Sequence, residues 1–446
     1  MKPIMDAVSV VLSCGDQIFM IKRQLQLKAF PGYWAFPGGK VDAGDEALAP
    51  AHDLIKNFDK KLIGAVIREI KEELSIDLAV ALQEHQVTHL DYLGLAVTPD
   101  FNPQRFSTHF FKVTLTIPLD FVMDTGEVMN ARWASASSFL DQYERGDMLS
   151  VPPVVQVIKA LGLDPKAHQV PTLAFSYDKE HEVPMIESIY GIRQIMPLSN
   201  TLPPANRTNS FLIGDHRKLL LDPSPKDHDE LSKMRHVANK FGVDAIFLTH
   251  HHGDHHEYAQ EIAHRYKLPI MLSADTHRRL KKINPDYFLG LNVVEVKEGD
   301  EVTHWLGHSV KVYEVPGHDE GQLALAPDNM AWFIAGDLFQ GVGTVVIGGD
   351  EGDMAKYMKT LERVIALKPK VLFPSHGIGL GGTGILAKTL EHRKIREEQV
   401  LSMTKAGKDP QEILSELYSD IPLALHKYAL MNIHSHLTKL KNEGLL

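Results

Sequence analysis

The sequence predicts an α/β protein with several domains, and three observations support this fold class. The chain has 446 residues, which is too long for one ordinary hydrophobic core. From about residue 190 to 385, short apolar segments alternate with helical patterns such as 257–266 and 354–366, as in an α/β domain. Breaks occur at residues 163–171 and in the glycine-rich run 377–384. The predicted divisions are a domain at 1–165, a linker at 166–189, a domain at 190–385 and a helical segment at 386–446.

Composition narrows the possible partners and compartment. The formal net charge of −10 gives no general support for nucleic-acid binding. A single cysteine excludes a disulfide framework and fits a reducing cytosol. Apolar runs stay short of the roughly 18 residues that a membrane span needs, and the first residues lack the pattern of a secretory signal. We therefore expect a cytoplasmic protein with no membrane partner.

A dense cluster of metal-ligand side chains follows the apolar segment at residues 245–248. The run from His250 to His255 reads His-x-His-x-Asp-His, and imidazole and carboxylate groups suit zinc and similar divalent ions. Side chains two residues apart point the same way at a strand end, so His250 and His252 can share one ion. Asp254 and His255 can serve a second ion about 3.5–4 Å away. The alternative is a solvated, histidine-rich loop.

Further residues of ligand type favour the metal site over the loop. Each follows a short hydrophobic run, at the loop edges where sites are usually built. These residues are Asp222, His318, Asp337 and His376. A single Asp or His in such a place is more often a helix cap or a satisfied polar group. Their occurrence together with the histidine motif instead predicts a metal centre.

This constellation resembles the metallo-β-lactamase fold superfamily. The resemblance implies an αββα sandwich with a dinuclear site in which Asp222 orients the ligands and Asp254 takes part in catalysis. The implied ligands are His250, His252 and His318 for one ion, Asp254, His255 and His376 for the other, and Asp337 as the bridge. Two divalent ions activate water for hydrolysis, so no Ser or Cys nucleophile is required. Zinc is the expected metal, and the ligand types also admit iron or manganese. Residues expected at the surface or in support are His251, His256, His304 and His308.

A second motif combines a glycine turn at Gly38-Gly39 with an acidic helix about thirty residues later. In that helix Val66, Ile70 and Leu74 recur at helical spacing and form a core face. Another face carries Glu69, Glu72 and Glu73. An exposed face compensated by Arg68 and Lys71 is one interpretation. A site for Mg²⁺ or Mn²⁺, which prefer oxygen ligands, is the other.

The glycine turn and the glutamates together resemble the Nudix box, which implies an α/β/α sandwich and hydrolysis of nucleoside diphosphates linked to another group. The implied Mg²⁺ or Mn²⁺ ligands are the Gly39 carbonyl, Glu69, Glu72 and Glu73, with Glu69 and Glu73 catalytic and Arg68 orienting the carboxylates. Asp45 replaces the first glutamate of the box, Ser75 replaces its last glycine, and about fifteen extra residues interrupt it at 47–61. This insertion, with the segment 105–111, resembles the branch that includes coenzyme A diphosphatases.

The last segment is expected to form helices at 392–403, 410–418 and 422–441, within a helical pattern that begins near Leu386. It resembles the small winged-helix-like appendage on the metallo-β-lactamase branch typified by a mitochondrial endoribonuclease. From Lys388 to Glu443 there are nine Lys or Arg and eight Asp or Glu, whereas a nucleic-acid reader normally has a clear basic excess. We therefore expect a packing element beside the metal site, and RNA contact is the less favoured alternative.

Three functions remain open from the sequence. The favoured one is a two-domain hydrolase acting on a small molecule, either a nucleotide or a coenzyme A derivative such as an acyl thioester. The second is a single-strand-specific endoribonuclease with an appended Nudix module, whose RNA binding should weaken steeply with salt. The third makes the Nudix domain a ligand sensor that regulates the other site.

Overall fold

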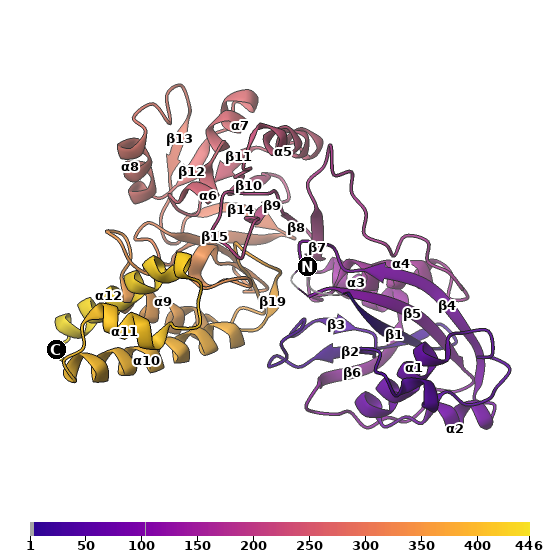
Figure 1. The fold of residues 1–446 in the computed structure, drawn as a ribbon. Coiled ribbons are helices and arrows are strands. Elements are labelled where there is room, and N and C mark those ends of the chain that lie inside the picture. The colour runs from indigo at the N-terminus through magenta and orange to yellow at the C-terminus, as the bar shows by residue number, and fades with distance from the viewer. Residues whose placement is uncertain (1–3, 103) are drawn as a thin grey trace. The chain divides into compact units, whose positions relative to one another are not determined.

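The structure is a computed structural model that describes residues 4–102 and 104–446, and the chain forms two compact units (Figure 1). Unit 1 contains the described residues up to Tyr177 together with Ile186–Tyr190. Unit 2 contains Asp178–Met185 and Gly191–Leu446. In the described part of the chain, no helix combines the length and the apolar character needed to cross a membrane.

Unit 1 is built on a mixed sheet with the order β3-β2-β1-β5-β4, in which β6 also pairs with β2. Its strands are β1 (Met5–Cys14), β2 (Gln17–Arg23), β3 (Trp34–Ala35), β4 (Val87–Val97), β5 (Phe106–Leu115) and β6 (Val128–Ser135). Strands β1 and β5 are parallel, and β1 is central. Successive side chains of a strand face opposite ways, so Val10 and Val11 enter two different cores.

Helices cover both faces of this sheet and give an α/β/α sandwich. On one face lies α1 (Lys60–Leu74), whose Val66, Ile70 and Leu74 are buried as predicted. On the other face lie α3 (Ala136–Glu144) and α4 (Pro152–Leu163). The short η1 (Asp45–Leu48) leads into the inserted segment, and α2 (Leu78–Gln83) follows α1.

Unit 2 has two sheets, each with helices on its outer face, as the αββα fold requires. The first sheet runs β13-β12-β11-β10-β9-β8 and the second β14-β15-β16-β17-β18-β19. The strands of the first are β8 (Ile192–Ile195), β9 (Ser210–Ile213), β10 (Leu219–Leu221), β11 (Ala245–Phe247), β12 (Ile270–Leu272) and β13 (Val293–Glu295). Those of the second are β14 (Glu301–Trp305), β15 (His308–Glu314), β16 (Leu323–Pro327), β17 (Phe333–Ile334), β18 (Val371–Phe373) and β19 (Leu380–Gly381). Strand β7 (Met185–Ile189) precedes them.

The helices of unit 2 follow the alternation seen in the sequence. The first sheet packs against α5 (His228–Phe241), α7 (Ala259–Tyr266) and α8 (Ala274–Ile283), and the second against α9 (Met354–Leu367) and α10 (Gly384–Lys405). Between the sheets, the rings of Phe211 and Phe373 lie 5.6 Å apart. Helix α7 begins two residues later than the predicted start at 257. Glu257 ends the short α6 (Gly253–His256), and Tyr258 then adopts a left-handed conformation at φ 61°.

The C-terminal segment is helical, with its own small core of Val400, Ile413 and Ile433. After α10 come α11 (Pro410–Leu417), η3 (Leu423–Leu425) and α12 (His426–Asn442). The helix predicted at 392–403 is the second half of the longer α10. The helix predicted at 422–441 is divided where η3 gives way to α12.

Candidate metal centres

The predicted ligands of unit 2 come from the ends of strands in both sheets. Asp222 follows β10, and His250 and His252 follow β11. The short helix α6 then carries Asp254 and His255. The second sheet supplies His318 beyond β15, Asp337 in η2 (Gly336–Leu338) beyond β17, and His376 beyond β18.

The structure brings His250, His252 and His318 together in one group. The Nδ1 atom of His252 lies 3.0 Å from Nε2 of His250 and 3.0 Å from Nε2 of His318. The ligand atoms of all three lie within 4.8 Å of one another. Three imidazole nitrogens that converge in this way can hold one divalent ion.

A second group contains Asp254, His255 and His376. Asp254 Oδ2 lies 3.9 Å from His255 Nε2 and 3.6 Å from His376 Nε2. These ligand atoms also lie within 4.8 Å of one another. The mixture of two imidazoles and one carboxylate suits a second divalent ion.

Asp337 lies between the two groups. Its Oδ1 is 3.5 Å from His255 Nε2 and 3.6 Å from His376 Nε2, while its Oδ2 is 3.7 Å from His318 Nε2. One carboxylate therefore offers an oxygen to each group, which is the arrangement expected of a bridging ligand.

Backbone carbonyls fix the proton of two ligand histidines. His318 Nδ1 donates to the carbonyl of Val346 and His376 Nδ1 to that of Arg207, both at 2.8 Å. Because a carbonyl oxygen can only accept, each of these rings carries its proton on Nδ1. The lone pair on Nε2 is thus directed toward the centre, as a metal ligand requires.

Asp222 and Thr249 orient the other two rings. Asp222 Oδ2 accepts hydrogen bonds from His255 Nδ1 at 2.8 Å and from the Thr249 hydroxyl at 2.6 Å. The Thr249 hydroxyl hydrogen is then committed to Asp222, so its oxygen accepts from His250 Nδ1 at 3.0 Å. The buried carboxylate of Asp222 therefore fixes the ring orientation of both His255 and His250.

Burial keeps two of the ligand imidazoles neutral. It lowers the pKa of His250 well below its usual value, and the neighbouring His255 and His252 lower it further. Burial likewise lowers the pKa of His318 to about 4, with a further contribution from His252. A neutral imidazole is the form that binds a metal.

The electrostatics around His255 show that this centre favours a cation. Burial disfavours the charged form of the ring, but the carboxylates of Asp254, Asp337 and Asp222 raise its pKa well above the usual value. His255 Nε2 and Asp337 Oδ1 are also buried without a hydrogen-bond partner. Because buried polar atoms are costly unless paired, these two atoms and the donor set around them fit a pair of divalent ions.

The sequence did not point to several neighbours of this centre. Glu351 Oε1 lies 3.5 Å from His252 Nε2, and its side chain forms a further group with His251 and His252. His251 forms an ion pair with the buried Asp319. Asp319 could have been found because it directly follows His318, whereas Glu351 lies in a loop without a recognisable pattern.

In unit 1, Arg68 gathers the carboxylates of the Nudix-like motif. Its guanidinium lies 2.7 Å from Asp45 Oδ1, 2.8 Å from Glu69 Oε1 and 3.0 Å from Glu72 Oε2. Burial opposes charge on Asp45, but the hydrogen bond from Arg68 lowers its pKa overall. Asp45, which stands where the box has glutamate, thus still reaches the arginine. Gly64 permits this approach, because a Cβ there would lie 1.7 Å from the Asp45 carbonyl oxygen.

Glu69 and Glu73 are buried, so the interpretation of an exposed acidic face is wrong for them. Glu73 Oε2 accepts a hydrogen bond from Gly38 N at 2.9 Å, while its Oε1 is buried without a partner. Burial raises the pKa of Glu73 to about 8. Burial also raises the pKa of Glu69, against the lowering effect of Arg68.

The Nudix-like glutamates do not converge as the residues of unit 2 do. Glu69 lies over Gly39, where a Cβ would be 2.4 Å from its Oε1. The Gly39 carbonyl accepts a hydrogen bond from Val8 N, and Glu72 is largely exposed. Within residues 4–102 and 104–446, the His, Cys, Asp and Glu groups that could hold an ion lie in unit 2.

Three parts of the chain match models of known families. Residues 203–376 match the model of the metallo-beta-lactamase superfamily, residues 3–150 that of the NUDIX domain, and residues 410–446 that of the beta-lactamase associated winged helix domain.

Several known proteins are similar to part of the chain. A Drosophila melanogaster protein called beta-lactamase-like protein 2 homolog is 29% identical over 257 residues, covering 54% of this chain and 84% of that protein. A hydroxyacylglutathione hydrolase of Bdellovibrio bacteriovorus is 31% identical over 137 residues, covering 30% of this chain and 49% of that protein. The crystal structure of a beta-lactamase domain protein from Burkholderia ambifaria has a TM-score of 0.51 at 18% identity, covering 60% of this chain and 91% of that one.

The similarity to the Burkholderia structure shows the fold alone. The buried His and Asp groups show that this fold carries residues that could hold metal ions. The chain is therefore an enzyme that joins an N-terminal Nudix hydrolase domain to a metallo-β-lactamase-fold hydrolase domain and a C-terminal β-lactamase-associated winged-helix segment.

Proposed function

We propose that the protein hydrolyses coenzyme A derivatives, with a dinuclear His/Asp centre that cleaves acyl thioesters and a Nudix site that cleaves diphosphates. The observation that carries the proposal is the pair of ligand groups that share Asp337. When bound, two divalent ions supply an activated water and polarise the oxygen of the group that is attacked. Zinc is the proposed metal, since its ligands in proteins are imidazole and carboxylate groups.

The proposed ligands are those that the sequence predicted in unit 2, and Asp254 has a further role. Its side chain is 18% exposed, whereas His255 and His376 of the same group are 0% and 2% exposed. Asp254 is thus the residue of this group that solvent reaches most readily. We therefore assign it to catalysis as well as to metal binding.

The choice of a thioester rests on chemical analogy. The relative from Bdellovibrio is named for hydrolysis of an acyl group carried by glutathione, and an acyl group joined to a thiol is a thioester. The Nudix domain adds a diphosphate-cleaving module, and coenzyme A contains both a thiol and a diphosphate. Analogy at the level of the fold is a weak argument for substrate, so the experiment must separate the two activities.

For the Nudix site, we propose that Glu69, Glu72, Glu73 and the Gly39 carbonyl hold Mg²⁺ or Mn²⁺. Glu73 Oε1 is buried without a hydrogen-bond partner, as an oxygen that binds a cation would be. Arg68 must then release Glu69 or Glu72 in part, because it now binds both carboxylates.

Mass spectrometry of the products tests the proposal. The protein is incubated with an acyl-coenzyme A, Zn²⁺ and Mg²⁺. Free coenzyme A that disappears in the Asp254→Ala variant assigns thioester hydrolysis to the dinuclear centre. Adenosine 3′,5′-diphosphate and acyl-phosphopantetheine that disappear in Glu73→Gln assign diphosphate hydrolysis to the Nudix site. Substrate that stays intact with both ions present overturns the proposal.

A specific observation favours a second candidate for unit 1. The engagement of Glu69 and Glu72 by Arg68 leaves no preformed cation site there, which suits a module that binds a ligand without turnover. Ligand binding to the Glu73→Gln variant that still changes the rate of the other centre would support this sensor role. Single-stranded RNA is a weaker candidate, because a net charge of −10 opposes it. RNA binding that falls steeply with salt would revive it.

A further inference from the structure

The loop that fixes His318 has no regular structure of its own. Residues 342–352 form neither helix nor strand, and most of their side chains are at least partly exposed. Val345 and Ile347 are the exceptions, with exposures of 3% and 0%. Between them, Val346 supplies the carbonyl oxygen that accepts the proton of His318 Nδ1. The position of one metal ligand therefore depends on what anchors these residues.

The anchors come from the C-terminal helices. Arg393 of α10 donates from Nη2 to the Val345 carbonyl at 2.6 Å. Asn432 of α12 accepts from the backbone N–H of Ile347 at 2.8 Å. The same Asn432 oxygen accepts from Arg393 Nη1 at 3.3 Å. Two side chains thus hold the residues on both sides of Val346 and are linked to each other.

Burial of Arg393 argues for a role beyond packing. The residue is 2% exposed, and within the described chain it has no carboxylate partner within 4.0 Å. Its guanidinium instead lies over the ring of Tyr357, at 5.6 Å from the ring centre. Burying an uncompensated charge costs stability, and an apolar residue of similar size would often stabilise a core better. The hydrogen bonds to the loop are what an apolar residue could not replace.

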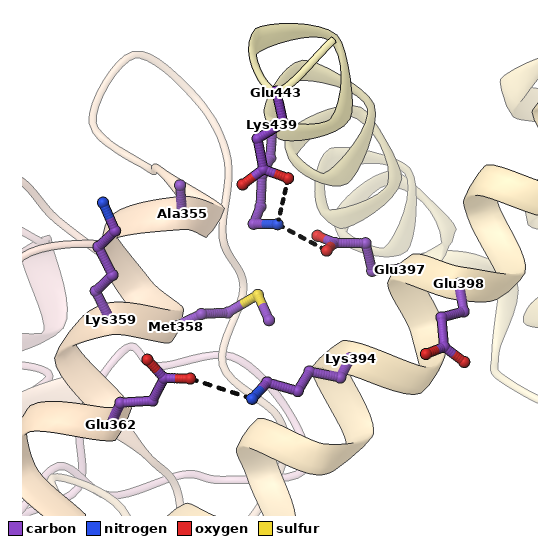
Figure 2. A pocket seen from close by; sticks show the side chains of 9 residues that line it. All are labelled: Ala355, Met358, Lys359, Glu362, Lys394, Glu397, Glu398, Lys439 and Glu443. Atoms are coloured by element: carbon purple, nitrogen blue, oxygen red, sulfur yellow. Dashed lines mark hydrogen bonds and ion pairs between the residues drawn. The ribbon is translucent and has the colours of Figure 1, made fainter. Parts of the chain in front are cut away.

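Ion pairs link the neighbouring helices α9, α10 and α12. A cleft of about 410 Å³ lies between α9, α10 and α12, and Figure 2 shows the side chains that line it. Across it, Lys394 of α10 pairs with Glu362 of α9 at 3.1 Å, and Lys439 of α12 pairs with Glu397 of α10 at 2.7 Å (Figure 2). The charges lining the cleft pair largely with one another. The cleft is therefore a charge-paired junction of these three helices.

We propose that Arg393 and Asn432 are positioning residues for the metal ligand His318, so that the winged-helix segment forms part of the metal centre. The path runs from Arg393 and Asn432 to the backbone of Val345 and Ile347, and from the Val346 carbonyl to His318 Nδ1. It rests on the proposed function only in requiring that His318 binds a metal.

Metal binding by the full-length chain tests this directly. Wild type, Arg393→Met and Asn432→Ala are titrated with Zn²⁺ against a chromophoric chelator, and the spectrum of bound Co²⁺ is recorded. Loss of the support for a ligand typically costs about 10–100-fold in metal affinity, so we expect this weakening for one of two ions. We also expect the Co²⁺ spectrum to change. Asn432→Asp keeps an acceptor oxygen in place and should retain affinity within a few-fold of wild type.

A matched control comes from the next turn of α10. Arg396 lies over the ring of Tyr418 at 4.5 Å and donates to the Leu417 carbonyl, so its contacts are with the segment itself. Arg396→Met should lower thermal stability without changing Zn²⁺ affinity or the Co²⁺ spectrum. If Arg393→Met and Arg396→Met weaken metal binding equally, the inference is wrong and the segment acts only through stability.

A double-mutant cycle covers the case in which Arg393→Met folds poorly. If Asn432 acts through His318, Asn432→Ala should weaken Zn²⁺ binding in wild type but have little further effect in a His318→Asn background. Additive losses would overturn the inference. Wild type that binds no Zn²⁺ would instead contradict the proposed function, so the two failures are distinguishable.

Discussion

At the residue scale, Asp222 is the side chain that supports ligands of both metal groups. It is buried, adopts a left-handed backbone conformation at φ 42°, and accepts hydrogen bonds from both Thr249 and His255. Through Thr249 it also determines which nitrogen of His250 is free. The carboxylate therefore acts on a ligand from each of the two groups without belonging to either.

The Asp222→Asn variant should weaken metal binding by about 10–100-fold. The amide nitrogen that replaces Oδ2 is a donor and would face the Thr249 hydroxyl and His255 Nδ1, so the histidine proton must move to Nε2. Competition with a chelator measures the change. The control is Asp215→Asn. The Asp215 carboxylate accepts hydrogen bonds from the backbone N–H groups of Leu306 and Gly307 in an exposed turn. Equal affinities for the two variants would contradict the prediction.

Ser75 offers a test in unit 1. It ends α1 in a left-handed conformation at φ 58°, where the Nudix box has glycine. That conformation costs an L-residue about 1–2 kcal/mol, and the greater freedom of glycine in the unfolded chain offsets about 0.5–1 kcal/mol of this. Ser75→Gly should therefore raise the free energy of unfolding by up to about 1 kcal/mol in urea titration. Ser75→Ala, which keeps the strain, should show no gain; a gain of equal size would refute the explanation.

Side-chain ligands could be predicted from the sequence, and backbone acceptors could not. His250, His252 and His318 each follow a buried apolar run, so their type and position both carry information. The carbonyls of Arg207 and Val346 carry none, because every residue has a carbonyl and only the folded loop decides which one faces a histidine.

At the scale of the elements, α10 shows why apolar periodicity fails to predict a helix that packs against several partners along its length. Helix α10 packs on α9 through Leu386 and Leu390, and on α11 and α12 through Val400. Because its apolar residues face different partners along its length, they form no single stripe. For that reason the sequence indicated a helical pattern from near Leu386 but assigned a helix only to 392–403. By contrast, α11 agrees closely with the helix predicted at 410–418, and in the structure Asp409 and Glu412 form a capping box beside Pro410.

His436 should make the stability of this helical segment depend on pH. Burial lowers its pKa from the usual 6.5, against the raising effect of Glu397, and Arg393 and Lys439 also face the ring; the ring of His392 lies near enough for mutual repulsion. The unfolded chain therefore binds the proton more readily than the folded one. Stability is full above about pH 6.5 and is lost as the pH falls through the lowered pKa.

Thermal unfolding between pH 7.5 and 5 should show this loss in wild type. In His436→Leu, the slope of the free energy of unfolding against pH should be smaller by up to about 1.4 kcal/mol per pH unit. His434, two positions earlier on α12, is exposed, and His434→Leu should leave the slope unchanged. A slope that stays the same in His436→Leu would mean that other groups cause the acid sensitivity.

At the scale of the whole molecule, the two compact units should respond to different metals. The proposed Zn²⁺ ligands all lie in unit 2, and the Nudix carboxylates lie in unit 1. A ligand that binds only the folded state stabilises it, by about 4 kcal/mol at a thousand times its dissociation constant. Removal of metal should therefore lower the stability of one unit and spare the other.

Calorimetry of the full chain tests this expectation. Treatment with a chelator should lower one unfolding transition, added Zn²⁺ should restore it, and Mg²⁺ should act on the other. In Asp254→Ala the response to Zn²⁺ should be strongly reduced. A Zn²⁺ response of equal size in both transitions would contradict the assignment of the metal centre to unit 2.

The path of the chain between the units has a practical consequence for anyone who wishes to divide the molecule. It passes from unit 1 to unit 2 after Tyr177, returns at Ile186, and leaves again after Tyr190. The returning strip is bound into unit 1, where Ser188 accepts from Ser150 N at 2.9 Å and Glu187 accepts from the Tyr143 hydroxyl at 2.7 Å. A single protease cut or gene truncation between residues 177 and 190 therefore leaves one half missing a piece that the other half carries. Because unit 2 also includes Asp178–Met185, a cut beyond Tyr190 has the same effect, and no single cut separates the two units with all their residues.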